Sequence, residues 1–295
     1  MFHTGDFMDK FCLITNRDKD TNLEITNQIT SYMRKNNKEC ILLEGSEIQD
    51  CGCYCTDTKE ISADIECAIV LGGDGTIIQA ANDLLGKNIP IMGINLGTLG
   101  FLAEIEKENI YTALDALYED NYRKQERMML YGKISSESMD IFEGTALNDI
   151  VITRSGFSRI ISVSIYINEE LVDRFRGDGV IVSTPTGSTG YSLSSGGPVI
   201  KPDAKVMVIT PICPHTLGAR SIVISAEDSV RIQINESKKT QDEEAIATID
   251  GRKVFLLHSG DYINVSKAKE TTNLIKINGI SFFNILRTKI GQGGE

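Results

Sequence analysis

One acidic residue stands inside a glycine-rich turn. The segment IVLGGDGTII (69–78) reads as a short apolar strand that ends in three glycines, with Asp74 among them. Such turns leave backbone N–H groups open to a phosphate, and the helix that follows adds its positive N-terminal end. Because a carboxylate repels a phosphate, Asp74 is expected to ligate a divalent metal or to accept the proton of an attacking hydroxyl. It could instead cap the helix at Thr76.

The turn fits neither of two common phosphate-binding patterns. The Walker motif needs a lysine and a longer loop, and the dinucleotide fingerprint needs a glycine where Ile78 stands. The residues alone therefore indicate a kinase of undefined acceptor or a simple helix cap.

A second block, RGDGVIVSTPTGSTGYSLSSGGPVI (176–200), gathers hydroxyls, glycines and open N–H groups suited to a polar small molecule. A short helix is expected near residues 191–194. Tyr191 could stack on a base or lie half-buried in the core. Asp178 could accept a hydrogen bond from an amide or a ribose hydroxyl, or stand as a turn residue.

A third segment, ALNDIVITR, places Asn148 and Asp149 at the head of a strand, where adjacent side chains are expected to point to opposite faces. An amide and a carboxylate side by side suit the two hydroxyls of a ribose, since one donates and one accepts. The alternative is an ordinary Asn-Asp turn.

Two fold classes follow one another along the chain. Up to residue 126, short apolar strands alternate with helical patterns, which predicts βαβ units and a doubly wound parallel α/β domain. Residues 127–272 read as short strands, and ISVSIYIN alternates with Ile161, Val163, Ile165 and Ile167 on one face, which predicts a β-sandwich that binds the dinucleotide. Residues 273–295 contain an amphipathic helix expected to pack back on the α/β domain.

Composition narrows the partners of the 295-residue chain. Its net charge of −11 argues against nucleic acid or an acidic membrane surface. No apolar run reaches the ~20 residues of a membrane span, and the N-terminus lacks a signal-peptide pattern, so a cytoplasmic location is expected. Cysteines in apolar runs indicate buried, reduced thiols. The CGCYC segment (51–55) lacks the paired spacing of a zinc site and is expected to be a loop with free thiols.

Taken together and in this order, LGGDGT, LNDI and GDGVIVSTPTGSTGYSLSSGGPVI resemble the signatures of the ATP-dependent NAD kinase family of bacterial type, as do NLGTLGFLAEI and PICPHTLGARSIVI. Phosphofructokinases and diacylglycerol kinases share the glycine turn, whereas the long Thr/Ser/Gly block is specific. The resemblance implies transfer of a phosphoryl group from ATP to the 2′-hydroxyl of the adenosine ribose of NAD. It also implies a divalent ion, usually Mg²⁺, and a homodimer or homotetramer.

The resemblance assigns Asp74 as the general base. It implies that a larger set of residues, which includes Asp74 itself, contacts the dinucleotide. These are Gly75, Phe101, Asn148, Asp149, Arg159, Arg176, Asp178, Thr186, Thr189, Gly190, Tyr191, Ser192, Leu193 and Ser194.

Four positions depart from the family pattern. Asp149 stands where the family more often has Glu, and Gly190 where it usually has Ala. Gln79 replaces a basic residue, and Arg252 replaces the Gln of a DGQ motif. Two alternatives stay open: a kinase with a sugar-phosphate or lipid acceptor, and a dinucleotide-binding regulator without turnover.

Overall fold

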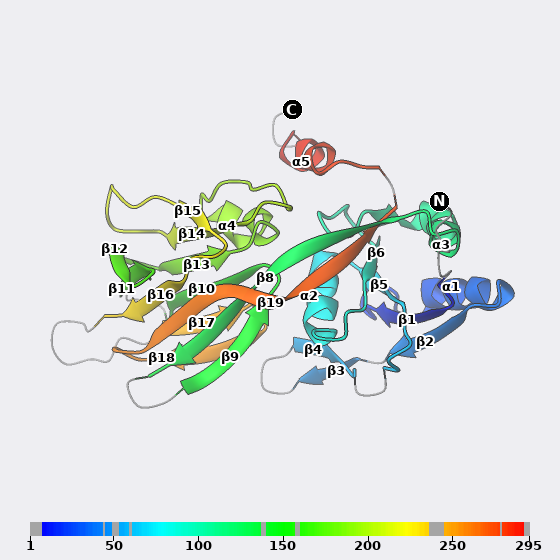
Figure 1. Ribbon diagram of the computed structural model, residues 1–295, viewed down its shortest axis with the longest axis horizontal. Helices are drawn as coiled ribbons and strands as arrows, with labels where there is room; N and C mark the ends of the chain where they lie inside the picture. The colour runs from blue at the N-terminus through cyan, green and yellow to red at the C-terminus, as the bar shows by residue number, and fades with distance from the viewer. Residues whose placement is uncertain are drawn as a thin grey trace. The chain divides into compact units, whose positions relative to one another are not determined.

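The structure is a computed structural model. It describes residues 8–43, 45–48, 53–58, 61–136, 140–156, 160–235, 245–277 and 279–291. The chain divides into two compact units (Figure 1). Unit 1 comprises Met1–Glu126 and Thr272–Glu295, and unit 2 comprises Arg127–Thr271. Within the described ranges, no helix combines the length and apolarity that crossing a membrane requires.

Unit 1 is built on a parallel sheet with strand order β6-β5-β1-β2 and β7 beside β6. The four expected apolar segments form its main strands, which confirms the predicted α/β pattern. The strands are β1 (Lys10–Thr15), β2 (Glu39–Leu43), β5 (Cys67–Gly72), β6 (Ile91–Asn95) and β7 (Ile105–Glu106). The last part of β19 (Tyr262–Lys276) adds one more parallel pairing, between Leu274 and Ile91.

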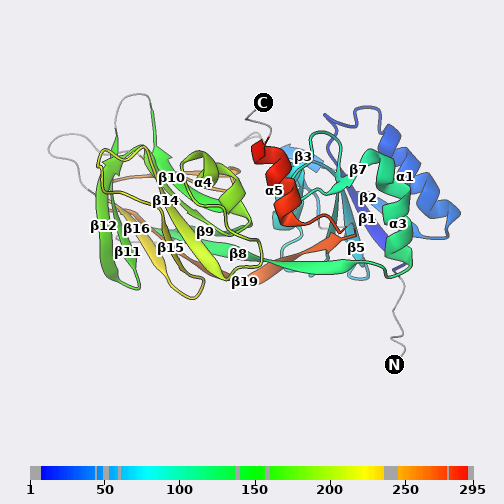
Figure 2. The same cartoon turned by 90° about the horizontal axis from the view of Figure 1, so that it is seen from above.

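Helices cover both faces of this sheet, so the doubly wound arrangement is confirmed. These helices are α1 (Glu24–Lys35), α2 (Asp74–Asp83) and α3 (Ile110–Tyr118), which a 3-10 turn (Lys107–Asn109) precedes. A fifth helix, α5 (Phe282–Gly291), follows β19, and its Phe282 ring lies 5.8 Å from that of Phe101. Figure 2 shows α1 and α3 side by side, and both share a core with alternate residues of the strands, such as Phe11 and Ile69. On the opposite face, Ile77 of α2 packs closely on Gly93 of β6. A Cβ added at Gly93 would lie 2.3 Å from Ile77 Cδ1.

Part of the CGCYC segment, expected to be a loop, belongs to an antiparallel hairpin instead. Its strands are β3 (Gly45–Ile48) and β4 (Cys53–Thr56), so two cysteines of the CGCYC segment lie in a strand, while Cys51 lies outside the described residues. The backbone N–H of Thr56 donates to Asp83 Oδ2 at 2.8 Å, which ties the hairpin to the end of α2. Backbone pairing forms this hairpin without the apolar alternation that would reveal it in the sequence.

Unit 2 is a sandwich of two sheet layers. One is an antiparallel sheet of order β15-β14-β13-β10-β17-β18, and the other follows β12-β11-β16-β19 with β8 and β9 attached. The strands are β8 (Arg123–Ser135), β9 (Asp140–Ala146), β10 (Asp149–Arg154), β11 (Ile161–Ile167), β12 (Glu170–Gly177), β13 (Gly179–Ser183), β14 (Val206–Ile212), β15 (Ile222–Ser225), β16 (Val230–Ile234), β17 (Ala245–Ile249) and β18 (Lys253–Leu257). Two short helical turns, Gly187–Thr189 and α4 (Tyr191–Ser194), follow β13.

One hydrophobic cluster takes side chains from both layers, for example Val182 of β13 and Val163 of β11, which confirms the predicted sandwich. The expected inward face of β11 is also confirmed, since its apolar residues all belong to or pack against this cluster. Tight turns lie at Asn168–Glu169 and Asp250–Gly251, where φ is positive.

Candidate active site

The glycine turn lies at the carboxyl end of β5, where α2 begins. An added Cβ at Gly72 would lie 2.2 Å from Thr76 Oγ1, so the packing of the turn itself requires this glycine. Gly75 differs, because it is exposed and nothing lies within 4 Å of the place where its Cβ would stand. The open backbone at Gly75 therefore allows a ligand to approach the start of α2 closely.

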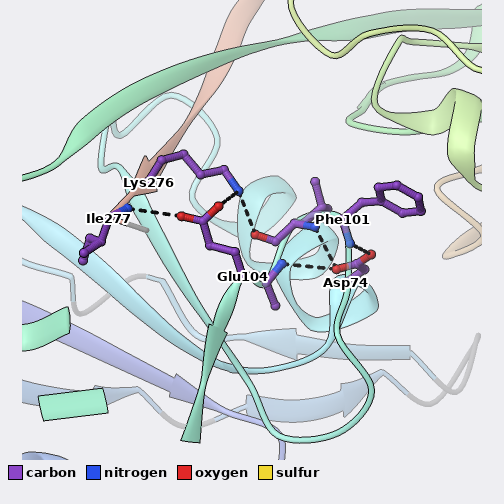
Figure 3. A network of polar contacts seen from close by, with 7 residues as sticks. Asp74, Phe101, Glu104, Lys276 and Ile277 are labelled. Atoms are coloured by element: carbon purple, nitrogen blue, oxygen red, sulfur yellow. Dashed lines mark hydrogen bonds and ion pairs between the residues drawn. The ribbon is translucent and has the colours of Figure 1, made fainter. Parts of the chain in front are cut away.

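Asp74 is the first residue of α2, whose N-cap is Gly73, and its carboxylate bonds outside the helix, so the interpretation of Asp74 as a helix cap is wrong. Its Oδ2 accepts a hydrogen bond from the Phe101 N–H at 2.8 Å. Its Oδ1 accepts from the Leu102 N–H at 3.0 Å and from the Ala103 N–H at 3.2 Å (Figure 3). Three consecutive amides thus hold the carboxylate in one orientation. We call residues 101–103 the amide cradle.

Gly100 is part of the same arrangement. A Cβ at this position would lie 1.9 Å from Asp74 Oδ1, so a side chain here would push the carboxylate out of the amide cradle. Phe101 is half-buried. Its ring centroid lies 5.8 Å from that of Phe282, and Lys289 Nζ lies 5.4 Å from it. The structure therefore brings together Asp74 and Phe101, two of the predicted site residues.

The loop after β1 supplies a lysine that the turn itself lacks. Asn16 Oδ1 accepts from the backbone N–H groups of Asp18 and Lys19, and Asn16 Nδ2 donates to Thr76 Oγ1 at 3.3 Å. This places Lys19 Nζ 3.1 Å from an added Cβ at Gly73. Sequence reasoning missed Lys19, although its position directly after a parallel strand was a usable signal, since the carboxyl ends of neighbouring strands meet at one edge.

A pocket of about 200 Å³ opens beside this loop and the head of α2. Its polar lining includes Arg17, Asp18, Thr76 and Gln79. Arg17 brings a guanidinium group to the same pocket as Gln79, one of the four positions at which the sequence departs from the pattern that it resembles.

In unit 2, Asn148 and Asp149 both face Gly190. An added Cβ at Gly190 would lie 3.4 Å from Asn148 Nδ2 and 4.0 Å from Asp149 Oδ2. The expectation that the two side chains point to opposite faces is therefore wrong, because Asn148 precedes β10 and is free of its alternation. Among the described residues, Asn148 Oδ1 is a buried acceptor without a hydrogen-bond partner. The structure thus assembles an amide and a carboxyl group around one glycine.

Asp250 holds this pair in place from the turn between β17 and β18. Its carboxylate accepts from the N–H groups of Leu147 (2.7 Å), Asn148 (2.8 Å) and Asp149 (3.1 Å). Asp149 is only 7% exposed. Burial, reinforced by the nearby Asp250 charge, raises the pKa of the Asp149 carboxyl to about 7. Sequence reasoning considered this segment only for the departure at Arg252 and missed the role of Asp250.

Several hydroxyls of the Thr/Ser/Gly block after β13 form hydrogen bonds within the protein itself. The Thr186 Oγ1 accepts from Arg127 Nη1 at 3.2 Å, Thr189 Oγ1 donates to the Thr186 carbonyl, and the Ser192 hydroxyl pairs with that of Thr210 at 2.9 Å. Thr186 and Ser192 are buried, Leu193 is half-buried, and Tyr191 and Ser194 are exposed. Of the predicted site residues in this block, Tyr191 and Ser194 are therefore the most open to solvent.

Asp178 lies between β12 and β13, where its Oδ1 accepts from Arg154 Nε at 2.8 Å. Arg176 is exposed on β12, and Arg159 lies outside the described residues. Although its ring is exposed, partial desolvation raises the pKa of the Tyr191 hydroxyl, and interactions with Cys213, Asp178 and Asp149 add to this rise. Tyr191 directly follows Gly190, the glycine that Asn148 and Asp149 face.

Two family models match the chain. The model described as the ATP-NAD kinase N-terminal domain covers residues 54–122, and that of the C-terminal domain covers residues 147–277. A relative named NAD kinase from Lachnoclostridium phytofermentans is 54% identical over 287 residues, which is 97% of this chain and 100% of the relative. Another NAD kinase, from Lachnospira eligens, is 39% identical over 294 residues, or 96% and 100% of the two chains.

Solved structures share the fold at lower sequence identity. Yeast NADH kinase complexed with NADH superposes with a TM-score of 0.80 at 20% identity, over 99% of this chain and 89% of that one. An NAD kinase from Archaeoglobus fulgidus in complex with ATP gives a TM-score of 0.72 at 24% identity, over 96% and 98%. With both domain models matched and full-length relatives well above 30% identity, the chain belongs to the NAD kinase family.

Proposed function

We propose that this protein transfers the γ-phosphoryl group of ATP to the 2′-hydroxyl of the adenosine ribose of NAD, giving NADP and ADP. Family membership supports the substrates, and both the lipid or sugar-phosphate kinase and the non-catalytic regulator are disfavoured by it. The observation that carries the proposal is the orientation of the Asp74 carboxylate beside an open glycine turn.

Asp74 has room for one more hydrogen bond. A carboxylate offers about four acceptor positions, and the amide cradle occupies two on Oδ1 and one on Oδ2. The remaining position on Oδ2 can accept the proton of a ribose hydroxyl as that hydroxyl attacks the phosphorus atom. Phosphoryl transfer depends mainly on positioning and charge neutralisation, so one fixed carboxylate oxygen is a suitable base.

Positive groups for the phosphates lie on the same side of unit 1. The N-terminal end of α2 and the Lys19 ammonium both lie at the glycine turn, and Arg17 lines the neighbouring pocket. We propose that this pocket receives part of ATP. Within the described residues, no group of three or more His, Cys, Asp or Glu side chains is placed to hold a metal. Mg²⁺ would therefore take most of its ligands from phosphate oxygens and water, and would neutralise phosphate charge when bound.

The dinucleotide is proposed to contact the polar group around Gly190. The buried Asn148 Oδ1 accepts no hydrogen bond from the described residues, and the Asp149 carboxyl lies beside it. Gly190 in place of Ala and Asp149 in place of the longer Glu both remove side-chain volume here, so the two departures together leave more room beside the pair. The exposed ring of Tyr191 is available to stack on a base. The other proposed contacts are Gly75, Phe101, Arg159, Arg176, Asp178, Thr186, Thr189, Ser192, Leu193 and Ser194.

We also propose a cytoplasmic homodimer or homotetramer without nucleic-acid or membrane partners. The net charge of −11 supports the proposal that nucleic acids and acidic membrane surfaces are not partners. Light scattering of the purified full chain, with and without NAD, tests the assembly, and a monomer in both conditions would contradict it.

The decisive assay measures NADP formation from NAD, ATP and Mg²⁺. The same protein is offered fructose 6-phosphate and diacylglycerol as acceptors, and NADH and polyphosphate as alternative substrates. Phosphorylation of NAD alone among the three acceptor classes is expected. Transfer to either of the other two classes, with none to NAD, would replace the proposal by the corresponding alternative.

Replacement of the base tests its role directly. Asp74→Asn is expected to lower kcat by about 10²- to 10⁴-fold while NAD binding stays within a few-fold. The asparagine turns an amide nitrogen toward one of the three donors, so a loss of about 1–3 kcal/mol in the free energy of unfolding is also expected. Steady-state kinetics, calorimetric titration with NAD and urea denaturation measure the three quantities.

Asp83→Asn is the matched control, because Asp83 lies on the same helix and also accepts from a backbone N–H. It should leave kcat near the wild-type value. Near-normal turnover in Asp74→Asn would remove Asp74 from its proposed role.

A further inference from the structure

The orientation of Asp74 depends on a short segment far from it in the sequence. All three hydrogen bonds to its carboxylate come from backbone amides of residues 101–103 (Figure 3). A backbone amide cannot adjust by changing rotamer, so the carboxylate moves whenever this segment moves. The direction of Asp74 therefore depends on whatever holds the amide cradle in place.

A buried ion pair holds it. Glu104 follows the cradle and is 3% exposed, and Lys276, at the end of β19, is 8% exposed. Lys276 Nζ lies 3.0 Å from Glu104 Oε2 and donates to the Leu102 carbonyl at 3.4 Å. Glu104 Oε1 in turn accepts from the Ile277 N–H at 3.1 Å. As Figure 3 shows, these contacts form one chain from the C-terminal return of unit 1 to Asp74.

Leu102 is the link between the two halves of this chain. Its N–H donates to Asp74, and its carbonyl accepts from Lys276, so the ammonium and the carboxylate hold opposite sides of one residue. A buried ion pair is rarely the most stabilising choice, because desolvation offsets the attraction between the charges. Apolar side chains of similar size could fill the same space, but they would not fix the position of a peptide group.

We propose that Lys276, paired with Glu104, is a positioning residue for the catalytic carboxylate: it fixes the amide cradle and through it the direction of Asp74 Oδ2. The inference rests on the proposed role of Asp74 as the base. A base acts when its oxygen lies about 2.6–3.2 Å from the atom that carries the proton, and a misplacement of about 1 Å can cost 100-fold in rate. The pair thus contributes to turnover more than to substrate binding.

The test removes both charges at once. In Glu104→Gln/Lys276→Met neither charge is left buried alone, and the glutamine keeps an acceptor for the Ile277 N–H. The expected result is a fall in kcat of about tenfold or more, with KM for NAD and ATP within about twofold and the circular dichroism spectrum retained. A role in general stability alone would not separate kcat from KM in this way.

Two further variants complete the design. Lys38→Met is the matched control, because Lys38 in unit 1 also bonds a carbonyl (Met8) and a carboxylate (Asp9), but nothing that leads to Asp74. It should leave kcat within about twofold. The single variant Lys276→Arg, with Glu104 unchanged, keeps the positive charge and the hydrogen-bond donors. It should retain most of the kcat that the double variant loses.

A folded double variant with kcat within about twofold of wild type would overturn the inference. If the double variant does not fold, the single Glu104→Gln variant is judged by the same criterion. The proposed function fails separately: in that case the wild type forms no NADP, or Asp74→Asn turns over normally. Unchanged kcat in the charge-pair variants beside an inactive Asp74→Asn removes only the positioning role.

Discussion

Two aspartates, one in each unit, make the same kind of hydrogen bonds to the backbone. Asp74 accepts from three consecutive amides at 101–103, and Asp250 accepts from three at 147–149. In the first case the carboxylate is the group being oriented. In the second it orients its donors, since Asn148 and Asp149 carry the side chains that face Gly190. The same set of hydrogen bonds therefore positions a proposed base in one place and a proposed binding pair in the other.

The buried Asp149 carboxyl predicts an unusual pH dependence of stability. Its pKa is raised from 3.8 to about 7 by burial, with a further contribution from the Asp250 charge. Between these values the unfolded chain has lost the proton that the folded chain keeps, so the free energy of unfolding falls as pH rises through this window. Asp149→Asn has no carboxyl to titrate, so its free energy of unfolding should not fall in this way. The difference in free energy of unfolding between Asp149→Asn and wild type should shift in favour of the variant by up to a few kcal/mol from pH 5 to pH 8, measured by urea denaturation.

Asp203→Asn, also in unit 2, serves as the control. A hydrogen bond from Lys201 lowers the pKa of the exposed Asp203 carboxyl, so any pH trend there should be small and of opposite sign. A stability difference between Asp149→Asn and wild type that stays constant from pH 5 to pH 8 would contradict the prediction.

At the scale of elements, the parallel sheet explains why loops remote in sequence meet. Strands β1, β5 and β6 are neighbours and run in one direction, so the segments after them emerge at the same edge. These segments carry Lys19, Asp74 and the amide cradle. The packing of α1 matters for the same reason, since the loop with Lys19 leads directly into it.

The Asp20 carboxylate accepts hydrogen bonds from the first turn of α1, so we expect its replacement to lower the stability of the protein. Asp20 is 5% exposed, and its carboxylate accepts from the Ile25 N–H and from the N–H and hydroxyl of Thr26. Asp20→Ala leaves these donors unsatisfied and should lower the free energy of unfolding by about 2 kcal/mol. Urea denaturation measures it.

The exposed neighbour Asp18 provides the comparison, and Asp18→Ala should change stability by less than about 0.5 kcal/mol. Equal effects of the two substitutions would show that the cap contributes nothing specific.

At the scale of the whole molecule, unit 1 is discontinuous in sequence. Its N-terminal 126 residues are completed by Thr272–Glu295. Leu274 and Ile275 from this return segment are buried, Leu274 pairs with Ile91 of β6, and Lys276 pairs with Glu104. The chain must therefore finish unit 2 before unit 1 receives its last strand and the ion pair next to the amide cradle.

Truncation at two points tests this dependence. A chain that ends at residue 271 loses Leu274 and Ile275, whose burial is worth about 2 kcal/mol each, together with the ion pair to Glu104. Unit 1 should then unfold at clearly lower urea concentration, as followed by hydrogen exchange of β5 and β6. A chain that ends at residue 277 keeps these contacts and should retain most of the protection. Equal protection in both truncated chains would contradict the prediction.

The sequence by itself determined the alternation of parallel strands and helices, the β-sandwich pattern and the family. These features are local: they depend on apolar periods of about two and 3.6 residues and on glycine positions, which each segment carries alone. The turns at Asn168–Glu169 and Asp250–Gly251 and the short helix Tyr191–Ser194 were predictable for the same reason.

Only the tertiary structure decided where the polar groups point. It turned Asp74 onto the amides of residues 101–103, brought Asn148 and Asp149 to one glycine, and engaged the Ser192 hydroxyl with Thr210. It also added Lys19 to the glycine turn and Lys276 to Glu104. Each of these contacts joins side chains or amides from distant segments. Their geometry depends on strand order and packing, which no local pattern of residues encodes.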